Sequence, residues 1–231
     1  MERKKYVIVT AGGTGTRMGA SVPKQFLELD GKPILRRTLE RIREAVPDVH
    51  ILTVLPQEHV TFWRHYCLQS SFTCPQRLVV GGFTRFHSVK NALEYVPDGA
   101  LVAVHDGVRP LVSAGLVRSL FEAAAHGAPA VIPVLPATDT LKVLAKGQDG
   151  LLHPTGEALD RSRVWAAQTP QVFHSEALKA AYAQGYDTLF TDDASVAERY
   201  GISLAFVPGE RTNLKITTPE DLALAQAIMK L

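Results

Sequence analysis

A glycine-rich stretch followed by two cations lies near the start of the chain. It runs from Ala11 to Gly19 as AGGTGTRMG, and Pro23-Lys24-Gln25 comes shortly after it. Glycines permit a tight turn and let a polyphosphate approach the backbone N–H groups closely. The spacing matches neither the dinucleotide fingerprint, which needs glycine where Met18 stands, nor the P-loop, which needs Gly-Lys-Ser/Thr. We therefore predict a loop that grips a nucleoside triphosphate, formed by Ala11, Gly12, Gly13, Thr14 and Gly15, with Arg17 and Lys24 stabilising the phosphate charge.

Asp106 and Arg109 follow another apolar run and form a second candidate group. Ligands of open α/β sheets bind beyond the carboxyl ends of the strands, so both side chains are expected to face the same crevice as the glycine loop. A carboxylate there could hold Mg²⁺ or a sugar or polyol hydroxyl. The alternative is that Asp106 only caps the turn that follows it.

Gly81-Gly82 predicts a second tight turn, whose backbone could contact a base or ribose. Ser88 follows, and we expect it to cap the start of the next helix and to bind the nucleoside triphosphate together with Gly81 and Gly82. Near the end of the chain, Lys215 alternates with Leu214 and Ile216, which predicts a strand. A lone lysine on a strand usually faces solvent, and only the company of the other motifs favours a role for Lys215 in a site.

Short apolar runs alternate with helical patterns along the chain, which predicts a Rossmann-like, mostly parallel sheet with helices on both faces. Apolar stripes predict helices through Leu35–Val46 and Val89–Val96, and Thr218-Pro219-Glu220-Asp221 is typical of a helix start. The predicted strands are Val7–Thr10, His50–Leu55, Leu78–Val80, Leu101–His105, Ala130–Val134 and Leu204–Val207.

The segment from about Ala137 to Arg163 interrupts this alternation. A partly alternating run, a turn at Gly147-Gln148-Asp149-Gly150 and a returning run predict a β-hairpin arm that leaves the sheet. A lone hairpin cannot bury its apolar residues. We expect a second subunit to cover it.

The composition restricts the class of protein. A length of 231 residues and a hydrophobic fraction of 46% suit one α/β domain spanning residues 1–231. The formal charge of +2, spread without blocks, argues against nucleic acid as a partner. No signal segment and no run of ~20 apolar residues is present, so we expect a cytoplasmic protein that does not bind membranes.

Taken together, these motifs resemble the 2-C-methyl-D-erythritol 4-phosphate cytidylyltransferase family of the non-mevalonate isoprenoid pathway. The resemblance covers nearly the whole chain. The matching pieces are the glycine loop with Arg17, Pro23-Lys24-Gln25, Gly81-Gly82 with Ser88, His105-Asp106 with Arg109-Pro110, Asp139-Thr140, Asp160-Arg161, Trp165, Thr169-Pro170-Gln171, Thr191-Asp192-Asp193-Ala194, Asn213-Leu214-Lys215 and the Thr218–Leu222 helix start.

The resemblance implies a nucleotidyltransferase fold and the transfer of CMP from CTP to methylerythritol phosphate, in a homodimer that uses Mg²⁺. Residues matching Arg17 and Lys24 stabilise the transition state, and those matching Arg161 and Lys215 position the acceptor phosphate. Thr140 and Arg161 would reach the partner's site from the arm. The expected acceptor-binding set is Asp106, Arg109, Thr140, Arg161, Thr169 and Lys215, and Mg²⁺ would be held by Asp106 or mainly by the CTP phosphates.

The chain departs from the family where acidic residues usually follow the glycine pair, since Phe83, Thr84 and His87 stand there. Two other functions remain open on the sequence. Ala11-Gly12-Gly13 and His105–Arg109 lean toward the related ribitol-5-phosphate cytidylyltransferases, whereas Asp139-Thr140 and Arg161 with Trp165 favour methylerythritol phosphate. A non-catalytic nucleotide-binding regulator would need the glycine loop but neither both loop cations nor the acceptor-binding pair.

Overall fold

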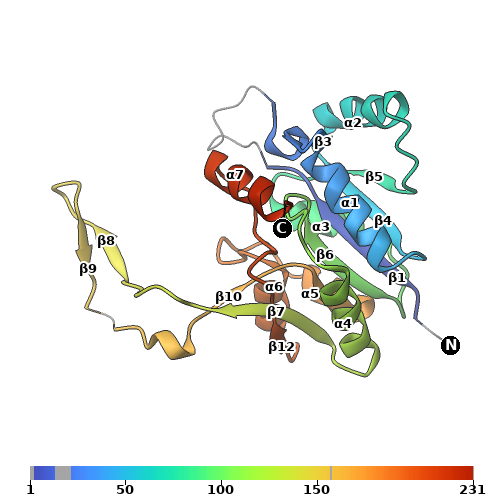
Figure 1. Ribbon diagram of the computed structural model, residues 1–231. Coiled ribbons are helices and arrows are strands. Elements are labelled where there is room, and N and C mark those ends of the chain that lie inside the picture. The colour runs from blue at the N-terminus through green and yellow to red at the C-terminus, as the bar shows by residue number, and fades with distance from the viewer. Residues whose placement is uncertain (1–2, 14–21, 157, 231) are drawn as a thin grey trace.

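A mixed sheet of eight strands forms the centre of the computed structural model, which describes residues 3–13, 22–156 and 158–230. The strand order is β10-β7-β11-β6-β1-β4-β5, with β12 beside β7 (Figure 1). The bounds are β1 Lys5–Thr10, β4 His50–Leu55, β5 Arg77–Val80, β6 Leu101–Asp106, β7 Ala130–Pro136, β10 Trp165–Ala167, β11 Gln171–His174 and β12 Ala205–Pro208.

The strands β6, β1, β4 and β5 run parallel to one another, and their register aligns their carboxyl ends. Thr10 at the end of β1 pairs with Asp106 of β6 on one side and with Val54 of β4 on the other. The loops that leave these strands therefore start at the same edge of the sheet. This register brings the glycine loop, the Gly81-Gly82 turn and Asp106 together.

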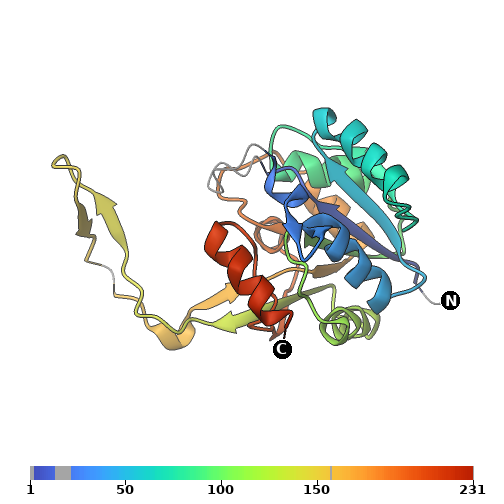
Figure 2. The same ribbon diagram turned by 45° about the horizontal axis from the view of Figure 1, so that its top comes forward.

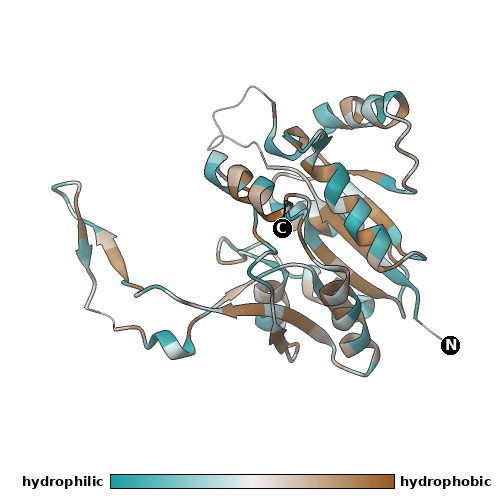
Figure 3. Cartoon of the chain, viewed as in Figure 1, coloured by the Kyte–Doolittle hydropathy of each residue, from teal (hydrophilic) through white to brown (hydrophobic). Residues whose placement is uncertain are grey.

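Helices cover both faces of the sheet, because alternate strand residues point to opposite sides. Val7 and Val9 face one apolar core with α1, α2 and α4, while Ile8 faces the other with α3, α5 and α6. Figure 3 shows the sheet strands as largely hydrophobic, while α1 and α2 carry both hydrophilic and hydrophobic residues. The helix bounds are α1 Ile34–Ala45, α2 Gln57–Gln69, α3 Arg85–Leu93, α4 Ala114–Ala125, α5 Ser175–Tyr182, α6 Asp193–Tyr200 and α7 Pro219–Ile228.

The doubly wound sheet confirms the predicted fold class, and local signals explain the helix boundaries. The α7 helix begins as predicted, with Thr218 and Asp221 forming a reciprocal capping box. The prediction for Ser88 is wrong: α3 begins at Arg85, and its cap is Thr84, whose hydroxyl accepts the N–H of His87. Ser88 lies inside the first turn of that helix, where its hydroxyl is directed back to the preceding loop.

A long arm leaves the body of the molecule between β7 and β10. Figures 1 and 2 show it reaching far from the sheet, with the hairpin of β8 (Leu144–Lys146) and β9 (Leu152–Pro154) at its outer end. The Gly147–Gly150 turn closes this hairpin through bonds from Gly147 N–H to the carbonyl of Leu151 and from Gly150 N–H to the carbonyl of Gly147. The predicted protruding hairpin is therefore present, and Leu151 and Leu152 on it are 64% and 65% exposed.

The remaining secondary structure is short. The strands β2 (Glu28–Leu29) and β3 (Lys32–Pro33) form a separate pair, and η2 (Lys24–Phe26) and η3 (Arg161–Arg163) are single helical turns. The strand predicted around Lys215 is wrong, because the backbone there is extended without joining a ladder, although Ile216 N–H donates to the carbonyl of Val108. Across the described ranges, no helix combines the length and apolar composition that crossing a membrane requires.

Candidate active site

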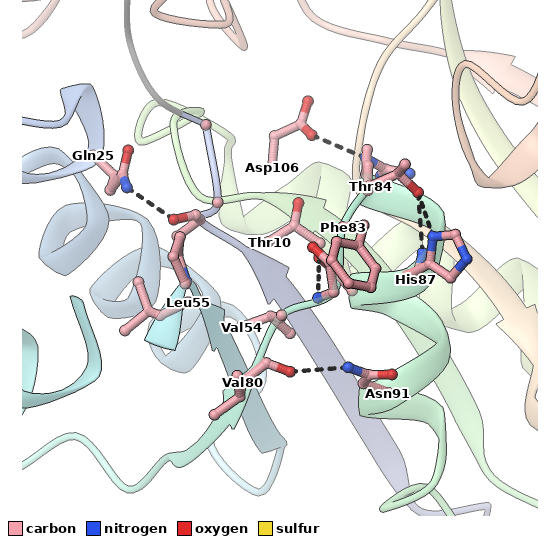
Figure 4. Close-up of a pocket in the computed structure, with 18 of the residues that line it drawn as sticks. Thr10, Gln25, Val54, Leu55, Val80, Phe83, Thr84, His87, Asn91 and Asp106 are labelled. Atoms are coloured by element: carbon pink, nitrogen blue, oxygen red, sulfur yellow. Dashed lines mark hydrogen bonds and ion pairs between the residues drawn. The ribbon is translucent and has the colours of Figure 1, made fainter. Parts of the chain in front are cut away.

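A cavity of about 830 Å³ opens at the carboxyl ends of β1, β4, β5 and β6. Its wall combines the loop after β1, the start of α2, the loop between β5 and α3, and residues after β6 (Figure 4). The lining side chains and backbone come from Thr10, Ala11, Gly12, Gly13, Lys24, Gln25, Val54, Leu55, Pro56, Gln57, Glu58, Val80, Gly81, Gly82, Phe83, Thr84, Arg85, His87, Ser88, Asn91, Asp106, Val108 and Lys215.

The first part of the glycine loop lines this cavity and is held from two sides. Ala11 N–H donates to the carbonyl of Val54 at 2.9 Å, and the buried Gln25 donates its Nε2 to the carbonyl of Ala11 at 2.9 Å. Lys24 lies against Gly13, where an added Cβ would be 3.1 Å from Lys24 Cε. Glycine at position 13 therefore leaves room for the lysine stem beside the loop. Thr14, Gly15 and Arg17 lie outside the described residues.

The Gly81-Gly82 turn lines the opposite wall and is tightly packed. A Cβ at Gly82 would stand 2.4 Å from His87 Cβ, a distance that no side chain can occupy. Gly82 N–H donates to Ser88 Oγ at 3.0 Å, so Ser88 fixes the turn from within α3. The sequence correctly grouped Gly81, Gly82 and Ser88. The predicted bond of Ser88 was wrong, because its hydroxyl bonds the glycine turn and Thr84 caps the helix.

Asp106 is the centre of a charged cluster at the base of the cavity. Its Oδ2 lies 3.1 Å from Lys215 Nζ and 3.2 Å from Arg109 Nε, and its Oδ1 lies 3.8 Å from Arg85 Nε. Burial by itself would raise the pKa of Asp106, but the charges of Arg85, Lys215 and Arg109 outweigh burial and hold the pKa well below its ordinary value. Asp106 is therefore ionised at neutral pH, with more positive than negative charge around it.

A hydrogen-bonded network behind β6 fixes the position of Asp106. Its backbone N–H donates to Thr169 Oγ1 at 3.0 Å, and Thr169 Oγ1 lies 3.0 Å from His105 Nδ1. The other ring nitrogen, Nε2, donates to the carbonyl of Arg109, so the Thr169 hydroxyl donates to an unprotonated Nδ1. Burial lowers the pKa of His105 to about 4, which keeps this ring neutral. Arg109 and Thr169 are buried and lie outside the cavity lining, in contact with Asp106.

The two arm residues that were expected to bind the acceptor lie elsewhere. Thr140 and Arg161 are exposed, and neither lines the cavity of its own chain. Arg161 donates its Nη1 to the carbonyl of Thr138 at 2.9 Å, at the root of the arm. Lys215, in contrast, lines the cavity and is 43% exposed there.

Among the lining residues, Arg85, Gln25 and Phe83 had no role in the site predicted from the sequence. Arg85 donates to the fully buried Asp193 at 2.6 Å and links α6 to the Asp106 cluster. Gln25 anchors the glycine loop, and Phe83 stands at the cavity wall. Their proximity to Lys24 and to Gly81-Gly82 in the sequence was an available signal. Arg85 was not recognisable as part of the cluster because Asp106 and Asp193 are distant from it in the chain.

The cavity thus presents a glycine loop with a lysine on one side and a lysine–carboxylate pair on the other, at the open edge of a doubly wound sheet. These features are typical of an α/β protein that binds a phosphorylated ligand beyond the carboxyl ends of its strands. A family model for 2-C-methyl-D-erythritol 4-phosphate cytidylyltransferase matches residues 5–231, and the chain belongs to that family. It is therefore a cytidylyltransferase.

Similar proteins cover nearly the full chain. One, from Porphyromonas gingivalis W83, is named 2-C-methyl-D-erythritol 4-phosphate cytidylyltransferase and is 47% identical over 230 residues, 99% of both chains. A Phocaeicola vulgatus protein of the same name is 44% identical over 225 residues, 97% of this chain and 99% of that protein. The crystal structure of 4-diphosphocytidyl-2C-methyl-D-erythritol synthase from Anaerococcus prevotii superimposes with a TM-score of 0.79 at 27% identity and 100% coverage of both chains.

Proposed function

We propose that the cavity is the active site in which this cytidylyltransferase transfers CMP from CTP to 2-C-methyl-D-erythritol 4-phosphate and releases pyrophosphate. One juxtaposition supports this assignment: the glycine loop with Lys24 and the Lys215–Asp106 pair line the same cavity. The first suits the triphosphate of the nucleotide, and the second suits a phosphorylated polyol. A regulator that only bound nucleotide would have no use for the second group.

The acceptor provides its own nucleophile. A phosphomonoester has a second pKa of about 6 and is therefore largely dianionic at pH 7. One of its oxygens attacks the α-phosphorus of CTP, and the bond between that phosphorus and the oxygen leading to the β-phosphate breaks. Pyrophosphate leaves with that bonding pair. The step needs no general base, and the difficulty is to bring two anions together.

The positive side chains would offset this repulsion. Lys24 beside Gly13 would hold charge that builds on the α-phosphate in the transition state, together with Arg17. Lys215 would orient the acceptor phosphate, together with Arg161 from a partner subunit. Asp106, fixed by Thr169 and Arg109, would accept hydrogen bonds from acceptor hydroxyls.

Mg²⁺ fits this site as a metal held mainly by the nucleotide. Within the described ranges, no group of three or more His, Cys, Asp or Glu side chains is placed to hold an ion. Asp106, the proposed protein ligand, is already surrounded by cations. Nucleotide-bound Mg²⁺ keeps waters and phosphate oxygens with few carboxylates, and it neutralises charge on the triphosphate.

The arm supports a homodimer in which each subunit completes the other's site. Leu144, Leu151 and Leu152 are 44%, 64% and 65% exposed. They lie on a hairpin that stands away from the sheet of its own chain (Figure 1). In a dimer with two-fold symmetry, each subunit would cover the arm of the other, and each arm would reach the other subunit's site. Arg161 would then act in trans.

Subunit mixing tests this arrangement. Arg161→Ala and Lys24→Ala homodimers should each be nearly inactive. A mixed dimer would have one site with both defects and one with neither, so activity should return toward half the wild-type value per mixed dimer. No recovery after confirmed subunit exchange would show that Arg161 serves its own subunit.

The substrate assignment is tested by a crossed assay. Pyrophosphate release is measured for CTP, UTP, ATP and GTP, each with 2-C-methyl-D-erythritol 4-phosphate and with ribitol 5-phosphate. We expect CTP with the methylerythritol substrate to give the highest kcat/KM. A preference for ribitol 5-phosphate would overturn the assignment of the acceptor, and no release with any pair would overturn the proposed reaction.

The cytoplasmic location and a single domain over residues 1–231 stay predictions.

A further inference from the structure

Phe83 stands at the wall of the active-site cavity with its side chain uncovered. It lies in the loop between β5 and α3, directly after the Gly81-Gly82 turn, and its exposed fraction is 102%. It also lines the cavity, and Figure 4 shows its ring among the residues drawn there. A large apolar ring that is fully exposed buries no apolar surface in the fold of its own chain.

A second phenylalanine three positions along the chain shows the contrast. Phe86 is 4% exposed, and its ring stacks on that of Tyr182 with centroids 4.7 Å apart and planes 21° apart. Phe86 therefore anchors α3 to the core, whereas Phe83 is directed away from that core. The packing of α3 does not account for an aromatic residue at position 83.

The loop that carries Phe83 is held rigidly. Gly82 N–H donates to Ser88 Oγ at 3.0 Å, and Thr84 Oγ1 lies 2.8 Å from His87 Nδ1. The Phe83 ring meets the His87 ring edge to face, with centroids 6.5 Å apart at 85°. A side chain on such a fixed loop loses little conformational entropy when a ligand covers it.

We propose that the ring of Phe83 stacks on the cytosine base of CTP and so contributes to nucleotide affinity. This inference rests on the proposed function, which puts the triphosphate at Gly12, Gly13 and Lys24. The base then extends toward the opposite wall, where Phe83 stands beside Gly81-Gly82. The face of a planar base and an aromatic ring stack favourably, and the contact does not depend on which base is present. Phe83 therefore adds affinity, while selectivity for cytosine comes from groups at the edge of the base.

The test compares Phe83→Ala and Phe83→Trp with a control, Phe206→Ala. Phe206 is a 60% exposed phenylalanine on β12, outside the cavity lining. We expect Phe83→Ala to raise the KM for CTP by roughly 5- to 50-fold, the lower part of the range for losing a base–aromatic stack. The kcat and the KM for the acceptor should change by less than about threefold, and Phe83→Trp should restore the KM.

A triphosphate without a base separates stacking from a change in loop shape. Phe83→Ala should leave the affinity of ribose 5-triphosphate unchanged, because that molecule presents no ring to stack on. In Phe83→Trp, CTP alone should change the fluorescence of the introduced indole, and ribose 5-triphosphate should not. Equal weakening of both triphosphates, or an unchanged KM for CTP, would overturn the stacking role. The wild-type enzyme in the same assay separates the two proposals. If the wild type is active while the stacking prediction fails, only the role of Phe83 is refuted; if the wild type is inactive, the proposed function is refuted.

Discussion

Replacing Asp106 by asparagine should destabilise the fold strongly, because it removes the negative charge that compensates buried cations. Asp106 and Arg109 are 6% and 9% exposed, and the Arg109 Nε–Asp106 Oδ2 distance is 3.2 Å. Removing one partner of a buried ion pair costs about 3–5 kcal/mol. We expect the lower end, about 3 kcal/mol, since Arg85 retains Asp193, and Lys215, at 43% exposure, retains access to water.

Thermal unfolding measures this cost. For a chain of this length, 1 kcal/mol corresponds to roughly 2–4 °C in Tm, so Asp106→Asn should lower the Tm by about 6–12 °C at pH 7. The pKa of Asp106 is depressed in the folded state, so the charge stabilises above the ordinary carboxyl pKa of about 4 and its contribution is lost as the pH falls below it. The difference between wild type and variant should therefore shrink in acid.

The matched control is Asp98→Asn. Asp98 makes the same kind of contact with Lys179 at 2.7 Å, but its side chain is 74% exposed. Exposed pairs contribute about 0–1 kcal/mol, so this variant should unfold within a few degrees of the wild type. Equal Tm shifts for the two variants would show that burial adds nothing to the stability contributed by the Asp106 ion pairs. That result would refute the prediction.

Three further predictions concern chemistry and pH. Lys24→Ala should lower the rate of pyrophosphate release by about 10²–10³ with the fold intact, as for other transition-state donors, and near-normal turnover would remove the basis of the mechanism. Lys215→Ala and Arg161→Ala should raise the KM for the acceptor without changing the CTP affinity measured by calorimetry; loss of CTP binding would mean that they serve the nucleotide. Because burial lowers the pKa of His105 to about 4, the stability it contributes is complete above about pH 6.5 and is lost as the pH falls toward 4, by about 3 kcal/mol. Urea midpoints at pH 7 and 4.5 should therefore differ less in His105→Asn than in the wild type, and an unchanged difference would contradict this account.

The parallel part of the sheet was predictable because its strands are continuous apolar runs. The predicted His50–Leu55 matches β4, and Val7–Thr10 and Leu101–His105 fall within β1 and β6. The strands β10 and β11 were missed because Trp165–Ala167 and Gln171–His174 are short and antiparallel, with little alternation. Their place is set by pairing with β7 and β6, which local sequence does not reveal.

The candidate site was predictable where chemistry and turn geometry coincide in a short segment. The glycine loop, Lys24 and Gly81-Gly82 are such cases, and the cavity joins them. The cluster at Asp106 was only partly predictable, because Arg85, Asp193 and Lys215 come from separate elements and meet through tertiary packing. Ser88 illustrates the limit of local signals. Its position near a helix start predicted a cap, but Ser88 bonds the preceding glycine turn and Thr84 caps the helix.

A crystal structure with CTP and 2-C-methyl-D-erythritol 4-phosphate, or with their product, tests the central claim most directly. We predict the nucleotide phosphates beside Gly12, Gly13 and Lys24, and the base beside Gly81-Gly82. A second pocket of about 540 Å³, lined in part by His50, Arg77 and Tyr95, lies at the amino ends of β4 and β5. Nucleotide bound there, with the first cavity empty, would contradict the account.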